Sequence, residues 1–308
     1  MPPATAQLQA VLSEQVLRSY APATVPGYLR HWHAFSRFLR LFSLPFTRPV
    51  PSEHVAYYAA WLSQQGKSVG HARAVLAAIA WFHKVEGLMD PTKSFAISRL
   101  LVAMKKRADP ARSKKALTRD LLHCMVRVCP LLFDPYLATL MRAAWLFAYY
   151  GCLRAGELCK SKTLAHTLKV GDVFLGGNPV DRVQFTLHSY KFSKEGKTCV
   201  VHKAATPELC LVRALLDYLQ VRPQEQGPLF LVQSGAPLTR ALLSKCLKEA
   251  LQASGEPSHD YDTHSFRAGR ATDLAAAGAS ETLIRETGRW QSNAFLKYLR
   301  FDIFDLPS

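Results

Sequence analysis

A basic segment near residue 110 divides the chain and limits what it can fold into. Residues 105–117 read KKRADPARSKKAL, with a proline, a single acidic residue and no apolar periodicity. The sequence therefore predicts two domains, over residues 1–104 and 118–308, joined by a basic linker. The basic residues of this linker are Lys105, Lys106, Arg107, Arg112, Lys114 and Lys115.

Helical periodicity runs through the first 104 residues. In the segment that begins near Thr24, aromatic residues recur at helical spacing and form one apolar stripe. Further helices are expected from Ser52, from Ser68 and after Asp90, because residues that favour helix N-termini precede each segment. This pattern predicts a small helical bundle. The stripe consists of Tyr28, Trp32, Phe35, Phe38 and Phe42.

Residues 118–308 mix helices with a short run of strands. Residues 134–151 are strongly apolar and predict a buried helix, whereas Val183, Phe185 and Leu187 alternate as in a strand. A small antiparallel sheet is therefore expected within residues 170–204. The predicted fold class is mainly α, with an N-terminal helical bundle and an α+β C-terminal domain.

Charge and composition narrow the class of partner. Lys and Arg total 39 against 23 Asp and Glu, a formal net charge of +16 at pH 7, which favours nucleic acid as a partner. A basic surface that serves only solubility is the alternative. The linker, likewise, is either a solvated connection or lies along a phosphate backbone. The seven Cys include no C-x-x-C pair, and no apolar run is long enough to span a membrane. We expect an intracellular protein with reduced thiols and no membrane partner.

Four short segments of the C-terminal half contain residue types used in phosphate chemistry. Each segment alone is more often structural than catalytic, but their order along the chain is specific. No carboxylates gather as a two-metal nuclease requires, and no Gly-rich phosphate loop is present, so no metal or cofactor is expected. The segments are CLRAGEL (152–158), SYKFSKEGK (189–197), THSFRAGRA (263–271) and GRWQSNAFLKYLR (288–300).

The order Arg, Lys, His-x-x-Arg, Trp, Tyr resembles the catalytic domain of tyrosine recombinases, the family of phage integrases and Cre. The resemblance covers residues 118–300, and the N-terminal bundle looks like the family's SAM-like core-binding domain. The last segment is most similar to recombinases of eukaryotic mobile elements of the DIRS and Crypton kind. The resemblance implies a site-specific recombinase that cuts and rejoins DNA through a 3′-phosphotyrosyl bond, without metal or ATP.

The resemblance assigns the nucleophile and the phosphate-binding cations. Tyr298 is the implied nucleophile, and Arg154 and Arg267 are the implied transition-state clamp. The residue types suit these roles, because attack on a phosphodiester places extra negative charge on its non-bridging oxygens. A planar guanidinium can donate two hydrogen bonds to such oxygens and does not deprotonate.

Three further residues have supporting roles in this reading. His264, three residues before Arg267, would bind the scissile phosphate or help to accept the tyrosine proton. Lys191 resembles the family's general acid, with Lys194 as the alternative donor. Glu157 is expected to hold either Arg154 or the helix of His264 in place.

The fifth catalytic position departs from the family pattern. Many relatives place a His or Trp nine residues before the nucleophile, whereas this chain has Arg289 at nine and Trp290 at eight. We favour Trp290, whose indole N–H and bulk would support the phosphate, and keep Arg289 as the alternative. Only ten residues follow Tyr298, which is short for the C-terminal helix that relatives dock into a neighbouring protomer.

The implied partner is double-stranded DNA, bound by two protomers per core site and by four in the synapse. The protein is expected with the DNA, in the nucleus of a eukaryote or the cytoplasm of a prokaryote. Two alternatives remain open at this point. One is an enzyme like the type IB topoisomerases, which relax DNA with a similar site, and the other is a domesticated protein that binds DNA without cutting it.

Overall fold

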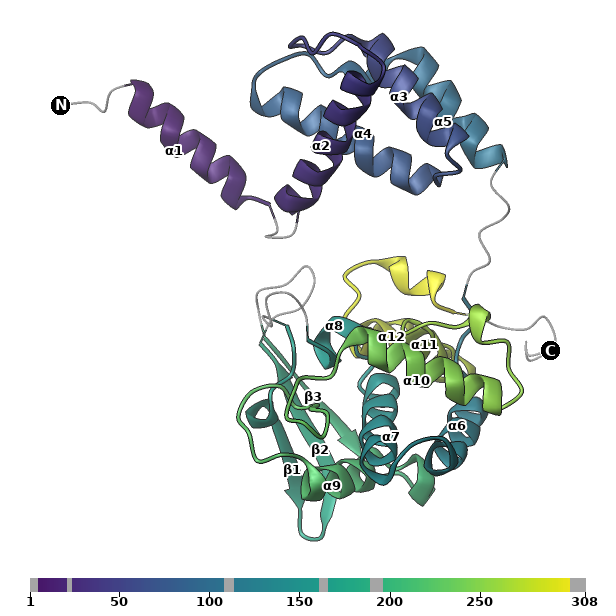
Figure 1. The fold of residues 1–308 in the computed structure, drawn as a ribbon. Helices are drawn as coiled ribbons and strands as arrows, with labels where there is room; N and C mark the ends of the chain where they lie inside the picture. Colours follow the sequence, from purple (N-terminus) through teal and green to yellow (C-terminus); the bar gives the residue numbers. More distant parts are fainter. Residues whose placement is uncertain (1–4, 21–23, 108–113, 161–165, 189–195, 300–308) are drawn as a thin grey trace. The chain divides into compact units, whose positions relative to one another are not determined.

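The computed structural model describes most of the chain as two compact units, residues Met1–Arg112 and Ser113–Ser308 (Figure 1). None of the described helices is both long enough and apolar enough to cross a bilayer. The described residues are 5–20, 24–107, 114–160, 166–188 and 196–299.

The first unit is helical, as expected, and packs around the predicted aromatic stripe. Trp32, Phe35 and Phe38 are buried in its core, whereas Phe42 is 50% exposed. The Ser68 hydroxyl accepts a hydrogen bond from the His71 N–H and so caps a helix as predicted. The α-helices are α1 (Thr5–Arg18), α2 (Thr24–Leu41), α3 (Ser52–Gln64), α4 (Val69–Val85) and α5 (Phe95–Arg107), with a 3₁₀ turn, η1, at Pro91–Lys93.

Two predicted helix starts differ in detail. Pro51, not Ser52, is the N-cap of α3 and makes no side-chain cap bond, so the predicted cap at Ser52 is wrong. The Asp90 carboxylate does accept from the Thr92 N–H, but it opens η1, and the α-helix begins only at Phe95. Proline one residue after Asp90 suits the first position of either kind of helix, which explains why the sequence pattern did not separate them.

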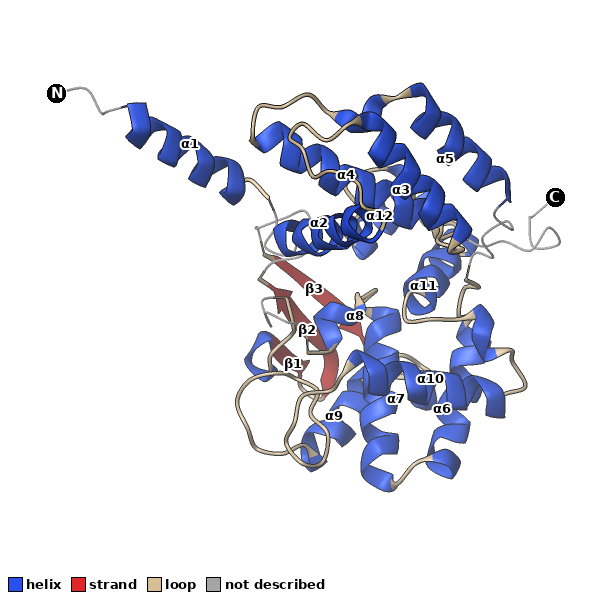
Figure 2. Ribbon diagram, turned by 45° about the horizontal axis from the view of Figure 1, so that its top comes forward, coloured by secondary structure: helices blue, strands red, loops and turns tan. Residues whose placement is uncertain are grey.

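The second unit combines seven described α-helices with a three-stranded sheet (Figure 2). The strands are antiparallel in the order β1-β2-β3, and α9 packs against β2 and β3. The elements are α6 (Arg119–Leu132), α7 (Pro135–Tyr150), α8 (Ala155–Leu158), β1 (Val173–Gly177), β2 (Val180–Leu187), β3 (Lys197–His202), α9 (Leu211–Val221), α10 (Arg240–Ala253), α11 (Ser265–Ala276) and α12 (Glu281–Gly288).

Helix α7 is the central element of this unit. It contacts α6, α9 and α11, and its Trp145, Phe147 and Tyr149 side chains are fully buried. On β2, the alternating residues predicted to share a face, with Phe185 at their centre, are buried, and the Phe147 and Phe185 rings meet edge to face at 4.9 Å. The predicted fold class, mainly α with a small antiparallel sheet, is confirmed.

The described ends of the predicted linker belong to the two units. Helix α5 continues to Arg107, so the first three basic residues form its last turn, where cations suit the helix dipole. At the other end, the Lys115 N–H donates to the Asp260 carbonyl at 2.8 Å and the Leu117 N–H to the Ser265 carbonyl at 3.0 Å. Arg112 lies outside the described residues. The assignment of DNA binding to the first unit and catalysis to the second stays a prediction.

Candidate active site

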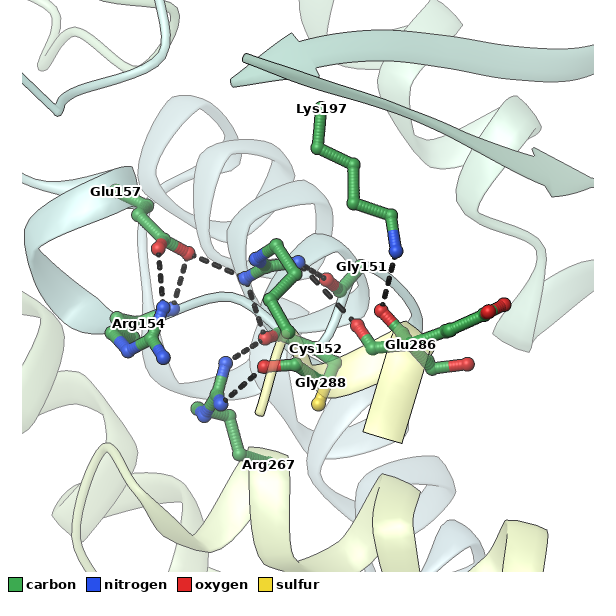
Figure 3. A network of polar contacts seen from close by, with 10 residues as sticks. Gly151, Cys152, Arg154, Glu157, Lys197, Arg267, Glu286 and Gly288 are labelled. Carbon is green, nitrogen blue, oxygen red and sulfur yellow. Dashed lines mark hydrogen bonds and ion pairs between the residues drawn. The ribbon is translucent and has the colours of Figure 1, made fainter. Parts of the chain in front are cut away.

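Arg267 lies at the centre of the candidate site, on the first turn of α11. Its side chain is 0% exposed. The guanidinium donates hydrogen bonds to the carbonyl oxygens of Cys152 and Gly288, the latter at 2.8 Å (Figure 3). Arg267 therefore joins the turn after α7 to the end of α12, two segments more than 130 residues apart in the sequence.

Glu157 is the buried carboxylate of the site and is 1% exposed. It accepts hydrogen bonds from the Arg154 backbone N–H at 2.8 Å and the Arg154 Nη1 at 3.0 Å (Figure 3). Because Arg154 precedes the first residue of α8, these bonds also close the first turn of that short helix. A third bond, at 2.7 Å, comes from the Arg289 Nη2. Glu157 thus contacts Arg154, as the sequence suggested, and a second arginine that was not predicted to meet it.

Arg289 is buried, and both of its terminal nitrogens have protein partners. Nη1 donates to the Gly151 carbonyl at 3.1 Å, and Nη2 donates to the Cys152 carbonyl at 3.0 Å in addition to Glu157. The residue adopts a left-handed backbone conformation, with φ of 58°, directly after α12. These bonds hold the guanidinium inside the protein, and the pairing with the Glu157 carboxylate distinguishes Arg289 from Arg267, whose described partners are carbonyl oxygens.

Trp290 and Tyr298 lie beside Arg267. The Arg267 Cζ is 4.8 Å from the centroid of the Trp290 ring and 5.8 Å from that of the Tyr298 ring. The two rings are themselves 5.1 Å apart between centroids. Tyr298 directly follows a 3₁₀ helix, η5 (Asn293–Lys297). Buried Phe295 anchors this segment in a small apolar cluster with Ala271 and Ile284, against which both rings pack.

His264 lies at the N-terminal end of α11, as its N-cap, with its ring exposed. Its backbone N–H donates to the Asp262 Oδ1 at 2.7 Å. Partial desolvation, the largest cause, and the charges of Arg240, Arg267 and Arg154 lower the pKa of the imidazole below 6.5, whereas Asp262 opposes the shift. The neutral ring therefore predominates near pH 7 and can accept a proton.

Arg240 is a cation of this region that the sequence did not single out. It is the first residue of α10, and its Nη2 donates a long hydrogen bond, 3.4 Å, to the Thr263 hydroxyl, next to His264. Its segment shares no motif with the four conspicuous ones, so only the tertiary structure reveals its position.

The lysines predicted as proton donors, Lys191 and Lys194, lie outside the described residues. Lys197, the third lysine of the same segment, is among the residues that the structure describes. Its Nζ donates to the Glu286 carbonyl at 2.8 Å (Figure 3). In the described part of the chain, no three His, Cys, Asp or Glu side chains gather in a way that could hold a metal ion.

Close packing explains why residue 288 is a glycine. A Cβ at Gly288 would lie 1.7 Å from the Trp290 Cζ3, so only glycine lets the indole ring lie against the end of α12. The resulting arrangement brings together the guanidinium groups of Arg154, Arg267 and Arg289, the Glu157 carboxylate, the His264 imidazole and the Tyr298 phenol. Such an excess of fixed positive charge is suited to binding a phosphate.

A comparison with known protein families shows which family the chain belongs to. The model of the phage integrase family matches residues 95–298, two thirds of the chain and all of the described site. This chain belongs to the phage integrase family. The resemblance to tyrosine recombinases drawn from the four sequence segments is thereby confirmed, whereas the similarity to DIRS and Crypton recombinases stays a prediction. A comparison of this integrase with curated proteins found no match.

Solved recombinase structures share the fold of this integrase. XerH bound to its difH substrate is 15% identical, with a TM-score of 0.61 over 90% of this chain and 75% of that one. A lambda integrase tetramer bound to a Holliday junction is 15% identical, with a TM-score of 0.62 over 97% and 78%. The Tn1549 transposon integrase in complex with circular intermediate DNA is 14% identical, with a TM-score of 0.64 over 96% of each chain.

Proposed function

We propose that this integrase cleaves and rejoins double-stranded DNA at specific sites through a covalent bond between Tyr298 and a 3′ phosphate. The observation that carries the proposal is the position of two aromatic rings beside a buried cation: the Trp290 and Tyr298 centroids lie 4.8 and 5.8 Å from the Arg267 Cζ. A phenol next to a guanidinium, with Arg154 and His264 nearby, supports nucleophilic attack on a phosphate.

The proposed reaction exchanges one phosphoester bond for another. The Tyr298 oxygen attacks the phosphorus, the bond between the phosphorus and the 5′ oxygen breaks, and the protein becomes joined to the 3′ phosphate of the cut strand. His264 takes the phenol proton, and Lys191, or Lys194 in its place, gives a proton to the leaving 5′ oxygen. Arg154 and Arg267 bind the non-bridging oxygens. Because the phosphotyrosyl bond conserves the bond energy, attack by a 5′ hydroxyl reverses the step without ATP or metal.

The proposed assembly follows the solved neighbours that share the fold. Lambda integrase has been solved as a dimer bound to a COC′ core site and as a tetramer bound to a Holliday junction. By analogy, we expect two protomers on each core site and four in the synapse. The net charge of +16 supports affinity dominated by phosphate contacts, which should fall steeply with salt. The basic residues near the unit boundary, including Lys105 and Lys114, are candidates for these contacts.

Trp290 is the proposed fifth catalytic residue. Its ring contacts both Arg267 and Tyr298, whereas Arg289 is bonded to Glu157 and to two carbonyl oxygens. Trp290→Ala should therefore slow cleavage by a folded, DNA-binding protein, and Arg289→Ala should act mainly by lowering stability. Full cleavage by Trp290→Ala, beside a folded but inactive Arg289→Ala, would reverse the assignment.

The decisive experiment is covalent trapping on DNA. Wild type and Tyr298→Phe are incubated, without metal or ATP, with nicked duplexes drawn from the DNA that flanks the gene, and the products are resolved on a denaturing gel. We expect a protein–DNA adduct from wild type alone. Binding by both proteins with no adduct from either would favour the non-cleaving alternative. Relaxation of supercoils without exchange between two duplexes would favour the topoisomerase-like one.

A further inference from the structure

We infer that Lys197 is a positioning residue that holds the segment carrying Trp290 and Tyr298 against the sheet. The inference rests on the proposed function, because it concerns the rate of the same cleavage step. Lys197 is the first residue of β3 and pairs with Leu187 at the end of β2. Its side chain reaches from the sheet to α12, the helix that ends two residues before Trp290 (Figure 3).

The contact with α12 is a charged hydrogen bond at the end of the helix. The Lys197 Nζ donates to the Glu286 carbonyl at 2.8 Å. The Glu286 carbonyl also accepts from the Arg289 N–H at 3.2 Å, and a cation at the C-terminal end of a helix is favoured by the helix dipole. The bond borders a cavity of about 180 Å³ that Leu283, Thr287 and Cys199 also line. The Lys197 bond to Glu286 is thus a polar connection between β3 and α12 at the edge of this cavity.

Strand β3 makes a second contact with the same segment. Residues two apart on a strand share a face, which places Cys199 on the same side of β3 as Lys197. Burial raises the pKa of the Cys199 thiol, and the nearby Arg289 guanidinium opposes that shift, so the thiol lies close to the Arg289 side chain. The sheet therefore meets the chain on both sides of Gly288, through the bond to Glu286 before it and beside Arg289 after it.

The segment held in this way is the one that completes the candidate site. The Gly288 carbonyl accepts from the Arg267 Nη2 at 2.8 Å, and the Trp290 N–H donates to the Arg285 carbonyl at 3.0 Å. A shift of the end of α12 would thus move both a carbonyl that orients Arg267 and the ring beside it. Lys197 therefore influences the position of Arg267 through the Gly288 carbonyl and the Trp290 ring.

Lys197 could instead be the proton donor, because it belongs to the segment that supplies the general acid. The two roles predict different results for two variants. Lys197→Met keeps the aliphatic stem but loses the donor, and Lys197→Arg keeps a donor that can reach the carbonyl but is too weak an acid to protonate the leaving oxygen. If Lys197 is a positioning residue, Lys197→Arg should keep most of the cleavage rate and Lys197→Met should not.

The experiment measures single-turnover formation of the DNA adduct by full-length protein. We expect Lys197→Met to cleave about 10–100-fold more slowly than wild type, with unchanged DNA affinity, and Lys197→Arg to recover most of the rate. The matched control is Lys245→Met, on α10, whose side chain is 72% exposed and should be replaceable without effect. Wild-type cleavage by Lys197→Met would overturn the inference.

A substrate with sulfur in place of the bridging 5′ oxygen separates positioning from proton donation. A thiolate leaves without being protonated, because a thiol is a much stronger acid than an alcohol. We expect Lys197→Met to be slowed by a similar factor on both substrates. Recovery of the rate on the sulfur substrate would make Lys197 the general acid and overturn the inference. Parallel losses of DNA affinity and melting temperature would also overturn it, by showing a general folding defect. If wild type itself forms no adduct, the proposed function fails instead.

Discussion

Replacing Gly288 by alanine tests whether the contact between α12 and the Trp290 ring sets the geometry of the site. The added Cβ would lie 1.7 Å from the Trp290 Cζ3 and 2.1 Å from its Cε3. Carbon atoms in contact lie about 3.5–4.0 Å apart, so the ring must move by about 2 Å. The ring centroid is 4.8 Å from the Arg267 Cζ and 5.1 Å from the Tyr298 centroid, so a displacement of this size disturbs both contacts.

Two consequences of different size follow for Gly288→Ala. Overpacking of this kind costs about 1–3 kcal/mol of folding free energy. For a unit of about 200 residues, each kcal/mol lowers the melting temperature by about 2–4 °C, so the protein should remain folded. The effect on chemistry should be larger, because a misplacement of about 1 Å in a catalytic group can slow a reaction by about 100-fold. We expect at least that loss in the rate of cleavage.

The assay is single-turnover adduct formation, together with DNA affinity and thermal unfolding. Gly156→Ala is the matched control, because Gly156 lies between Arg154 and Glu157 on α8 and a Cβ there would meet no atom within 4 Å. It should cleave at the wild-type rate. Cleavage by Gly288→Ala at the wild-type rate would refute the reasoning, since it would show that the position of the Trp290 ring does not matter.

Three further predictions concern groups around the site. Glu157→Ala leaves the buried Arg289 without its counter-charge and should lower the free energy of unfolding, measured with urea, by about 3–5 kcal/mol; a loss below about 1 kcal/mol would contradict the pairing. The lowered pKa of His264 keeps its ring neutral at pH 7, so the cleavage rate should fall on acidification only below pH 6.5, and His264→Gln should weaken that pH dependence. A cleavage rate that already falls above pH 6.5 would contradict this. Gly269→Ala would place a Cβ 1.8 Å from the Leu117 carbonyl oxygen and should lower the melting temperature, and an unchanged value would show that residues 114–117 are not packed on α11.

Local sequence signals predicted much of the fold. The apolar run after Asp134 forms α7, and the Asp134 carboxylate caps that helix by accepting from the Leu137 N–H. The alternation on β2 put Phe185 on the buried face, as predicted. These features depend on residues close together in the chain, where periodicity and capping act directly. The family resemblance could likewise be seen in the sequence, because the residue types of the site lie in four short segments whose order along the chain is visible without the structure.

The pairings inside the site could not be read from the sequence. The sequence leaves Arg289 as the alternative for the fifth catalytic position, but in the structure it pairs with Glu157, 132 residues earlier. Its left-handed φ of 58°, unusual for a residue other than glycine, turns the side chain toward the interior. Arg240 had no motif to mark it, and its place beside Thr263 follows only from how α10 packs. Such long-range contacts depend on the whole arrangement of helices, which no local pattern encodes.

The balance of charge at the site is consistent with the proposed cleavage of a phosphodiester. In the described part of the chain, Arg154 and Arg289 both pair with the Glu157 carboxylate. The fully buried Arg267 donates only to peptide carbonyls there, and its Nε has no hydrogen-bond partner. Burial accordingly lowers the pKa of Arg267, since it disfavours the charged form. A bound phosphodiester supplies one negative charge to this cluster, and a pentacoordinate phosphorane supplies more. In the proposed reaction, we therefore expect the cluster to stabilise the transition state more than the bound substrate, which is the condition for accelerating the cleavage step.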